Sequence, residues 1–194
     1  MNQRTAAPPT SHSARPRATP SDRKTGPSRL FPTKNDLPEA TRARVSDLLN
    51  QRLADCIDLQ TQCKQAHWNV KGPSFIALHK LFDDINEDVE EYVDLLAERV
   101  VQLGGIAEGT ARAVAKRTSL DEYPFHQTSG QAHVDALSSA LAAFGSGARK
   151  AIEQVDELDD PDTVDILTEI SRGIDKWLWF VEAHLQGATE GEKH

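Results

Sequence analysis

The chain has 194 residues, with 30 acidic side chains against 22 basic ones and a net charge of −8 at pH 7. Residues 1–36 carry a balance of +5, so the remainder carries −13 and is long enough for one domain with its own core. The chain has no run of about 18 apolar residues, so the sequence predicts no membrane span. The N-terminus lacks the apolar core of a signal peptide, although its Arg and Ser content superficially resembles an organellar transit peptide. We therefore expect a cytoplasmic protein with a basic tail.

Residues 1–35 are rich in Pro, Ser, Thr and Arg and poor in apolar residues, which predicts a disordered N-terminal tail. Its basic side chains are spread out with no aromatic residues between them. That pattern favours contacts to DNA phosphates without readout of bases. A solubilising tail that binds nothing is the alternative. The basic residues are Arg4, Arg15, Arg17, Arg23, Lys24, Arg29 and Lys34.

The first long helix is predicted to start at Asp36, which has capping-box spacing to Glu39. Its apolar stripe has helical periodicity. A break follows, where Gly72 can end one helix and Pro73 with Ser74 can start the next. The second helix is predicted from about Ser74 to Leu103, ending at Gly104-Gly105. The stripe of the first helix comprises Val45, Leu49, Leu53, Cys56, Cys63, His67 and Val70.

A connection over residues 106–129 follows, with a short helix predicted over residues 118–123. A third helix is predicted from about Gln131 to Leu158 and a fourth from about Pro161 to Gln186. Residues 187–194 are expected to form a short flexible C-terminal tail. No strand-like alternation stands out. The pattern over residues 36–186 therefore predicts a four-helix bundle with one long crossover.

Cys56 and Cys63 are the only cysteines. They lie about 10 Å apart along one predicted helix, which is too far for a disulfide. We expect them to be reduced core residues and not metal ligands.

Side chains that can bind a metal are concentrated in one stretch, with sequence spacings of 12, 4, 11 and 4. The last four share one helix face, because these spacings are close to whole helical turns. The two histidines lie six residues on either side of Pro73, so antiparallel helices joined by a tight turn can bring them together. The set is His67, His79, Asp83, Asp94 and Glu98.

One helix cannot place all of these side chains on one ion, because it rises about 16 Å between Asp83 and Asp94. Either the pairs serve separate sites, or a second copy runs antiparallel across a two-fold axis near Asp88 and Val89 and completes two identical sites. A solvated acidic face is the alternative without a metal. The Glu-x-x-His motif of ordinary di-iron bundles is absent, which argues against a site inside one subunit.

The run Ala66-His67-Trp68-Asn69-Val70-Lys71-Gly72, with Leu78-His79, Phe82-Asp83 and Asp94 through Glu98-Arg99, resembles the Dps family of mini-ferritins. The likeness covers about residues 36–186. It implies an all-α, ferritin-like four-helix bundle that assembles into a hollow homo-dodecamer built from two-fold dimers. It also implies a ferroxidase centre with ligands from two subunits: His67, His79 and Asp83 from one, and Asp94 and Glu98 from its mate.

The resemblance further implies that iron(II) is oxidised, preferably with hydrogen peroxide, and stored as ferric oxide, and that DNA is protected from oxidative damage. Imidazoles and carboxylates suit this chemistry. An aromatic residue beside the centre, Trp68 here, would intercept radicals; plain packing is the alternative. The main alternative function is a nucleoid-compacting DNA-binding protein with a vestigial or structural metal site. A di-iron oxidase of an organic substrate has no supporting pocket motif.

The corner between the third and fourth helices is strongly acidic, and the resemblance places it at a three-fold pore of the shell. Three copies of such a cluster would attract cations. The alternative is a solvated helix start, where acidic side chains suit the helix dipole. The pore candidates are Asp156, Glu157, Asp159, Asp160, Asp162 and Asp165.

Overall fold

The computed structural model describes residues 30–127 and 129–186. Over these residues it is all-helical, with no strand, as the sequence predicts. Four long helices and one short helix make up the fold, which confirms a helical bundle with a short helix in the crossover. In chain order they are α1 (Glu39–Asn69), α2 (Phe75–Gln102), α3 (Ala111–Arg117), α4 (Gly130–Asp156) and α5 (Pro161–Gln186).

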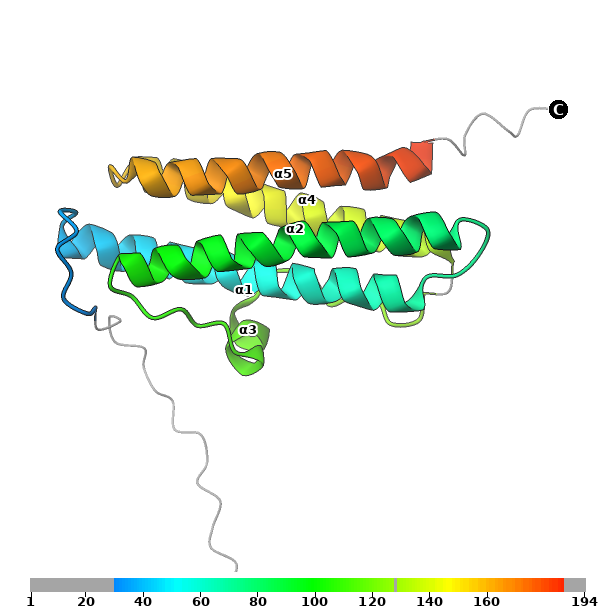
Figure 1. The fold of residues 1–194 in the computed structure, drawn as a ribbon, viewed down its shortest axis with the longest axis horizontal. Coiled ribbons are helices and arrows are strands. Elements are labelled where there is room, and N and C mark those ends of the chain that lie inside the picture. Colours follow the sequence, from blue (N-terminus) through cyan, green and yellow to red (C-terminus); the bar gives the residue numbers. More distant parts are fainter. Residues whose placement is uncertain (1–29, 128, 187–194) are drawn as a thin grey trace, which may run out of the picture.

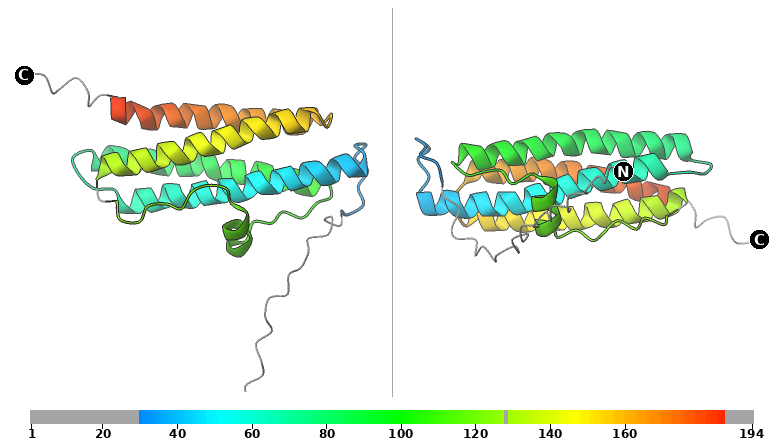
Figure 2. Two further views of the ribbon diagram at one scale, coloured as in Figure 1. Left: turned by 180° about the vertical axis from the view of Figure 1, so that it is seen from behind. Right: turned by 90° about the horizontal axis from the view of Figure 1, so that it is seen from below.

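The bundle consists of two antiparallel helix pairs, α1 with α2 and α4 with α5, which pack against each other (Figure 1). The segment between α2 and α4 runs the length of the bundle outside α1 and carries α3 halfway along (Figure 2). This long connection makes α2 and α4 parallel, whereas a short loop would have made them antiparallel. One long face of α2 is consequently left without a helix of the same chain over it.

The core is built from the apolar stripes that the sequence predicts. Val45, Leu49 and Leu53 of α1 are buried, as are the free thiols Cys56 and Cys63. Burial raises the pKa of the Cys63 thiol to about 12, so it stays protonated at neutral pH. The predicted role of the two cysteines as buried core residues is confirmed.

The predicted capping box at the start of α1 is wrong. Pro38 is the N-cap, no side chain caps this end, and Asp36 makes no capping hydrogen bond. Asn35 organises the entry instead, because its side-chain oxygen accepts from the Leu37 N–H at 3.0 Å. Pro38 at the N-cap has φ −54° and ψ 141°, and its carbonyl accepts from the Arg42 N–H at 3.0 Å.

The prediction of a short helix over residues 118–123 is also wrong, because the short helix of the crossover ends before these residues, at Ala111–Arg117. Its Ala, Arg and Lys residues are strong helix formers. Thr118 and Ser119 are instead held by α1: the Thr118 hydroxyl donates to Asp58 at 2.7 Å, and the Ser119 N–H donates to Asp55 at 2.7 Å. These contacts to α1 decide the conformation after Arg117.

The two turns at the ends of α2 use glycine at positive φ. Gly72 has φ 107°, and Gly104 has φ 86°. After Gly104 the Gly105 N–H donates to the Val100 carbonyl at 2.9 Å, which closes α2 as a Schellman motif. A Cβ at position 104 would also collide with the Phe31 carbonyl, so this turn admits only glycine.

Residues 30–35, the end of the predicted N-terminal tail, lie beside that turn, where the Phe31 N–H donates to the Gly104 carbonyl at 2.7 Å. The rest of this tail and the predicted C-terminal tail fall outside the described residues. None of the helices described is long and apolar enough to cross a membrane.

Candidate metal centre

The two histidines of the predicted constellation meet beside the turn that joins α1 to α2. The His67 and His79 rings are stacked, with centroids 3.7 Å apart and an interplanar angle of 21°. Phe75 packs against the His79 ring at 5.1 Å. The predicted meeting of the two rings across this turn is therefore confirmed.

Backbone carbonyls fix which nitrogen of each ring is available. His67 Nδ1 lies 2.7 Å from the His79 carbonyl oxygen, and His79 Nδ1 lies 2.9 Å from the His67 carbonyl oxygen. A carbonyl only accepts, so each neutral ring carries its hydrogen on Nδ1 and leaves the Nε2 lone pair free. Metal-binding histidines are commonly oriented in this way, by a hydrogen bond from the other ring nitrogen.

Asp83 lies one turn after His79 on α2, and its Oδ1 is 3.8 Å from His67 Nδ1. Lys64 of α1 donates to the same oxygen at 2.5 Å. This hydrogen bond holds the pKa of Asp83 below its ordinary value. The carboxylate is thus ionised, and its side chain is 38 % exposed. The Lys64 ammonium lies at the oxygen that a metal cation would otherwise contact.

Asp94 and Glu98 are exposed on the same helix but do not join this group. The rise of α2 separates Asp83 from Asp94 by about 16 Å. Within residues 30–127 and 129–186 of one chain, no group of three or more His, Cys, Asp or Glu side chains is placed to hold a metal ion. The constellation is therefore split into a half-buried group, His67 on α1 with His79 and Asp83 on α2, and an exposed pair, Asp94 and Glu98, farther along α2.

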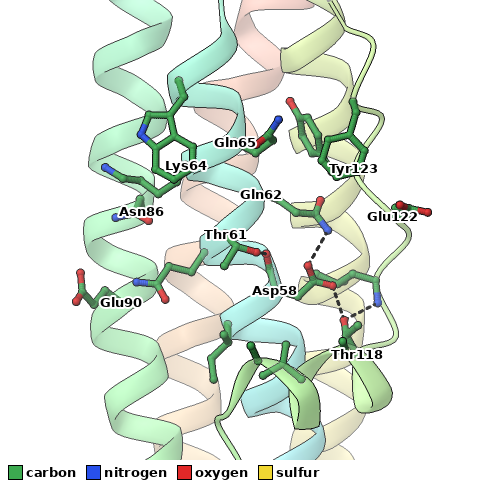
Figure 3. A pocket seen from close by; sticks show the side chains of 18 residues that line it. Asp58, Thr61, Gln62, Lys64, Gln65, Asn86, Glu90, Thr118, Glu122 and Tyr123 are labelled. Carbon is green, nitrogen blue, oxygen red and sulfur yellow. Dashed lines mark hydrogen bonds between the residues drawn. The ribbon is translucent and has the colours of Figure 1, made fainter. Parts of the chain in front are cut away.

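Trp68, predicted to lie near the site, is 68 % exposed, so it is not packed in the core of its own chain. It lines an open groove of about 1020 Å³ together with Phe125, which is 63 % exposed. Figure 3 shows the walls of this groove: Asn86 and Glu90 lie on α2, and Tyr123 lies on the crossover. The groove thus borders the open face of α2.

The acidic corner between α4 and α5 is mostly exposed, but Asp160 is 1 % exposed. Its carboxylate accepts from Arg99 at 2.7 Å and from the Thr163 N–H at 3.1 Å. Asp160 is therefore a structural residue at the start of α5, which corrects its prediction as a pore residue. The remaining pore candidates are solvent-facing: Asp156, Glu157, Asp159, Asp162 and Asp165.

Among the predicted DNA-binding residues only Lys34 is described, and its side chain is exposed. The other six lie outside the described residues.

Lys64 is the residue of this site that sequence reasoning missed. It lies three residues before His67 on α1, a spacing that puts both side chains on one helix face. That spacing could have indicated it. The two imidazoles and the Asp83 carboxylate are ligand types that suit a divalent metal of the iron type, whereas the Lys64 ammonium is a competing cation at that carboxylate and not a ligand.

Comparisons with known proteins agree with this architecture. A family model described as a ferritin-like domain matches residues 46–189. The DNA protection during starvation protein of Agrobacterium fabrum is 48% identical over 154 residues, covering 79% of this chain and 95% of that protein. The structure of Mycobacterium smegmatis Dps has a TM-score of 0.77 at 34% identity, covering 86% of this chain and 95% of that one. DpsA14 from Streptomyces coelicolor has a TM-score of 0.76 at 35% identity, covering 80% and 94%.

Proposed function

Because the chain belongs to the Dps family of ferritin-like proteins, we propose that it oxidises and stores iron and thereby protects DNA. The observation that carries this proposal is the stacked histidine pair, whose Nε2 atoms are left free by the hydrogen bonds at Nδ1, together with the Asp83 carboxylate 3.8 Å from His67 Nδ1. Iron(II) is the substrate of this centre. Hydrogen peroxide is the oxidant: its O–O bond breaks as it accepts one electron from each of two iron(II) ions, and the two hydroxide ions formed take up protons to give water, so no hydroxyl radical is released.

A second subunit completes the centre. An antiparallel copy of α2 that sets Asp83 opposite Asp94 also sets His79 opposite Glu98, because both pairs of positions share one midpoint. Asp94 and Glu98 are exposed and available for this role. The groove that contains Trp68 and Phe125 borders the same face, and a partner would cover these apolar side chains. The homo-dodecamer that the family resemblance implies is then built from such dimers.

Storage requires a route for iron into the shell. The exposed acids at the corner between α4 and α5, among them Asp156 and Asp162, supply a negative potential there. We assign them to a cation entrance at the three-fold contact.

The iron chemistry is tested by Asp83→Ala and Glu98→Ala, each made separately. Either change should abolish peroxide-dependent iron oxidation, measured by absorbance after anaerobic iron(II) loading, because each removes a carboxylate from the shared centre. Asp84→Ala is the matched control, because Asp84 is an exposed acid beside Asp83. Light scattering checks that assembly is unchanged. An unchanged oxidation rate in either ligand variant would contradict the proposal.

Binding of DNA is assigned to the basic N-terminal tail, since the remainder of the chain carries −13 and would repel phosphates. Several tails on one shell would act together by avidity. We expect full-length protein to shift DNA of any sequence in a gel, and a truncated chain beginning at Asn35 to lose this shift. The shift of the full chain should weaken steeply with salt. Equal shifts for both chains would exclude the tail.

A further inference from the structure

A buried tyrosine–histidine pair lies outside the centre described above. Tyr123 of the crossover and His133 of α4 are 6 % and 1 % exposed. The Tyr123 hydroxyl lies 2.5 Å from His133 Nδ1, and the two rings are stacked with centroids 6.1 Å apart. Such a contact also anchors the crossover to α4, so the chemistry of the pair must be distinguished from that anchoring role.

The hydroxyl is the donor in this contact. Burial lowers the pKa of His133, so the ring is neutral at neutral pH and has one nitrogen with a free lone pair. His133 also interacts with the Asn69 carbonyl, which attracts a ring N–H. His133 Nε2 has no hydrogen bond of ordinary geometry among the described residues. We assign the ring hydrogen to Nε2, in line with the influence of the Asn69 carbonyl, so that Nδ1 accepts from Tyr123.

The pair is close to the metal centre through α1. Cys63 is buried and near enough to Tyr123 to help raise the pKa of the tyrosine above its ordinary value, although burial is the larger cause. Cys63 precedes His67 by one helical turn, a separation of about 5–6 Å between Cβ atoms. Tyr123, labelled in Figure 3, also lines the same groove as Trp68, so both aromatic side chains border one open space.

From this geometry we infer that Tyr123 and His133 form a proton-coupled one-electron donor that quenches oxidising radicals escaping from the metal centre. The oxidant is a hydroxyl radical, formed when hydrogen peroxide takes only one electron from iron(II), or the indole radical that it leaves on Trp68. The electron passes from the Tyr123 ring to this oxidant, which is reduced by one electron. The O–H bond of Tyr123 breaks and its proton moves to His133 Nδ1, leaving a neutral tyrosyl radical beside an imidazolium.

Tyr92 is the internal control, because the chain has only two tyrosines. Tyr92 is 9 % exposed and packs against Gly173 of α5. Its hydroxyl has no hydrogen-bond acceptor among the described residues. The carboxylates of Asp88 and Glu169 lie near enough to help raise the pKa of Tyr92, but neither is hydrogen-bonded to its hydroxyl, whereas Tyr123 has His133 in direct contact. The two residues therefore separate the effect of a buried phenol from the effect of a phenol paired with a base.

The test uses full-length, metal-free protein, so that it does not depend on the proposed iron chemistry for its oxidant. Azide radicals made by pulse radiolysis oxidise tryptophan side chains by one electron, and transient absorption follows the radicals. In the wild type the tryptophanyl signal should decay as a tyrosyl signal grows, more slowly in D2O because a proton moves with the electron. Tyr123→Phe should lose the tyrosyl signal, and Tyr92→Phe should retain it.

His133→Gln separates proton transfer from anchoring. The Gln side-chain oxygen can accept the Tyr123 hydrogen bond, but it cannot hold a proton at neutral pH. We expect a several-fold lower tyrosyl yield, with tryptophanyl formation and the circular-dichroism melting curve unchanged. A tyrosyl signal that survives Tyr123→Phe, or an equal yield and D2O effect in His133→Gln, would overturn the inference. If the wild-type protein gave the expected tyrosyl signal but did not oxidise iron(II), that result would count against the proposed function alone.

Discussion

At the scale of single residues, the candidate metal centre is organised before any metal arrives. The carbonyls of His67 and His79 each hold the other ring by its Nδ1–H, so both Nε2 atoms are preset. Lys64 occupies one oxygen of Asp83 and supplies a positive charge there. The lysine keeps the carboxylate ionised and oriented, and an incoming cation must displace it.

Lys64→Gln should therefore strengthen iron(II) binding. An exposed ion pair of this kind contributes about 0.2–1 kcal/mol, so the affinity should rise by at most about fivefold. Anaerobic isothermal titration calorimetry measures this change. The pKa of Asp83, followed by NMR, should move back up toward its ordinary value, because its main cause of depression is gone.

Lys80→Gln is the control for Lys64→Gln, because Lys80 is an exposed lysine next to His79. This substitution removes the same charge but leaves the contact between Lys64 and Asp83 in place. Equal gains in the two variants would mean that net charge, and not displacement of Lys64, controls the affinity. Weaker binding in Lys64→Gln would show that the lysine supports the metal-bound state.

At the scale of elements, a buried ion pair joins α2 to α5. Arg99 Nη2 lies 2.7 Å from Asp160, and its Nε donates to the Thr163 hydroxyl at 2.8 Å. The side chains of Arg99 and Asp160 are 6 % and 1 % exposed. Asp160 also accepts from the Thr163 N–H, which caps the start of α5. One carboxylate thus fixes both the start of α5 and its contact with the end of α2.

Asp160→Ala should lower the free energy of unfolding by about 3–5 kcal/mol, because it leaves the Arg99 charge buried without a partner. Urea denaturation at fixed protein concentration measures the change. Asp162→Ala is the comparison, since Asp162 is 80 % exposed and 3.8 Å from Arg99; its effect should be within about 0.5 kcal/mol. Similar losses in the two variants would contradict this role of Asp160.

The four long helices and the meeting of His67 with His79 could be predicted from the sequence, because both depend on local spacing. Helical periodicity gives the apolar faces, and equal distances from Pro73 give the histidine pair. The position of α3 could not be predicted from the sequence, because Thr118 and Ser119 are hydrogen-bonded to acidic side chains of α1 about sixty residues earlier. The contact between Tyr123 and His133 likewise depends on the path of the crossover, for which the sequence has no periodic signal.

At the scale of the whole molecule, the open face of α2 determines how two copies can pair. The antiparallel arrangement proposed above also sets Glu87 opposite Glu90, because these positions share the same midpoint. Both are exposed acids. Their repulsion weakens the middle of the contact and is reduced by salt. Apolar burial from the groove beside it must then hold the proposed dimer together.

A mixing experiment separates a shared centre from one inside a single chain. Asp83→Ala and Glu98→Ala each damage both centres of their own dimer. In a mixed dimer of the two variants, one centre carries both substitutions, whereas the other has an intact Asp83 from one chain and an intact Glu98 from the other. Random pairing after co-expression should therefore restore peroxide-dependent iron oxidation to about one quarter of the wild-type rate.

Joining both substitutions in one chain provides the control for this mixing experiment. Co-expression of that double variant with wild type gives about one quarter wild-type dimers and about one half mixed dimers by random pairing. A mixed dimer of double variant and wild type instead carries one lost ligand in each centre, so activity should fall to the wild-type dimers alone, about one quarter. If each centre belonged to one chain, this mixture would keep about half of the activity, and the two single variants would not rescue each other.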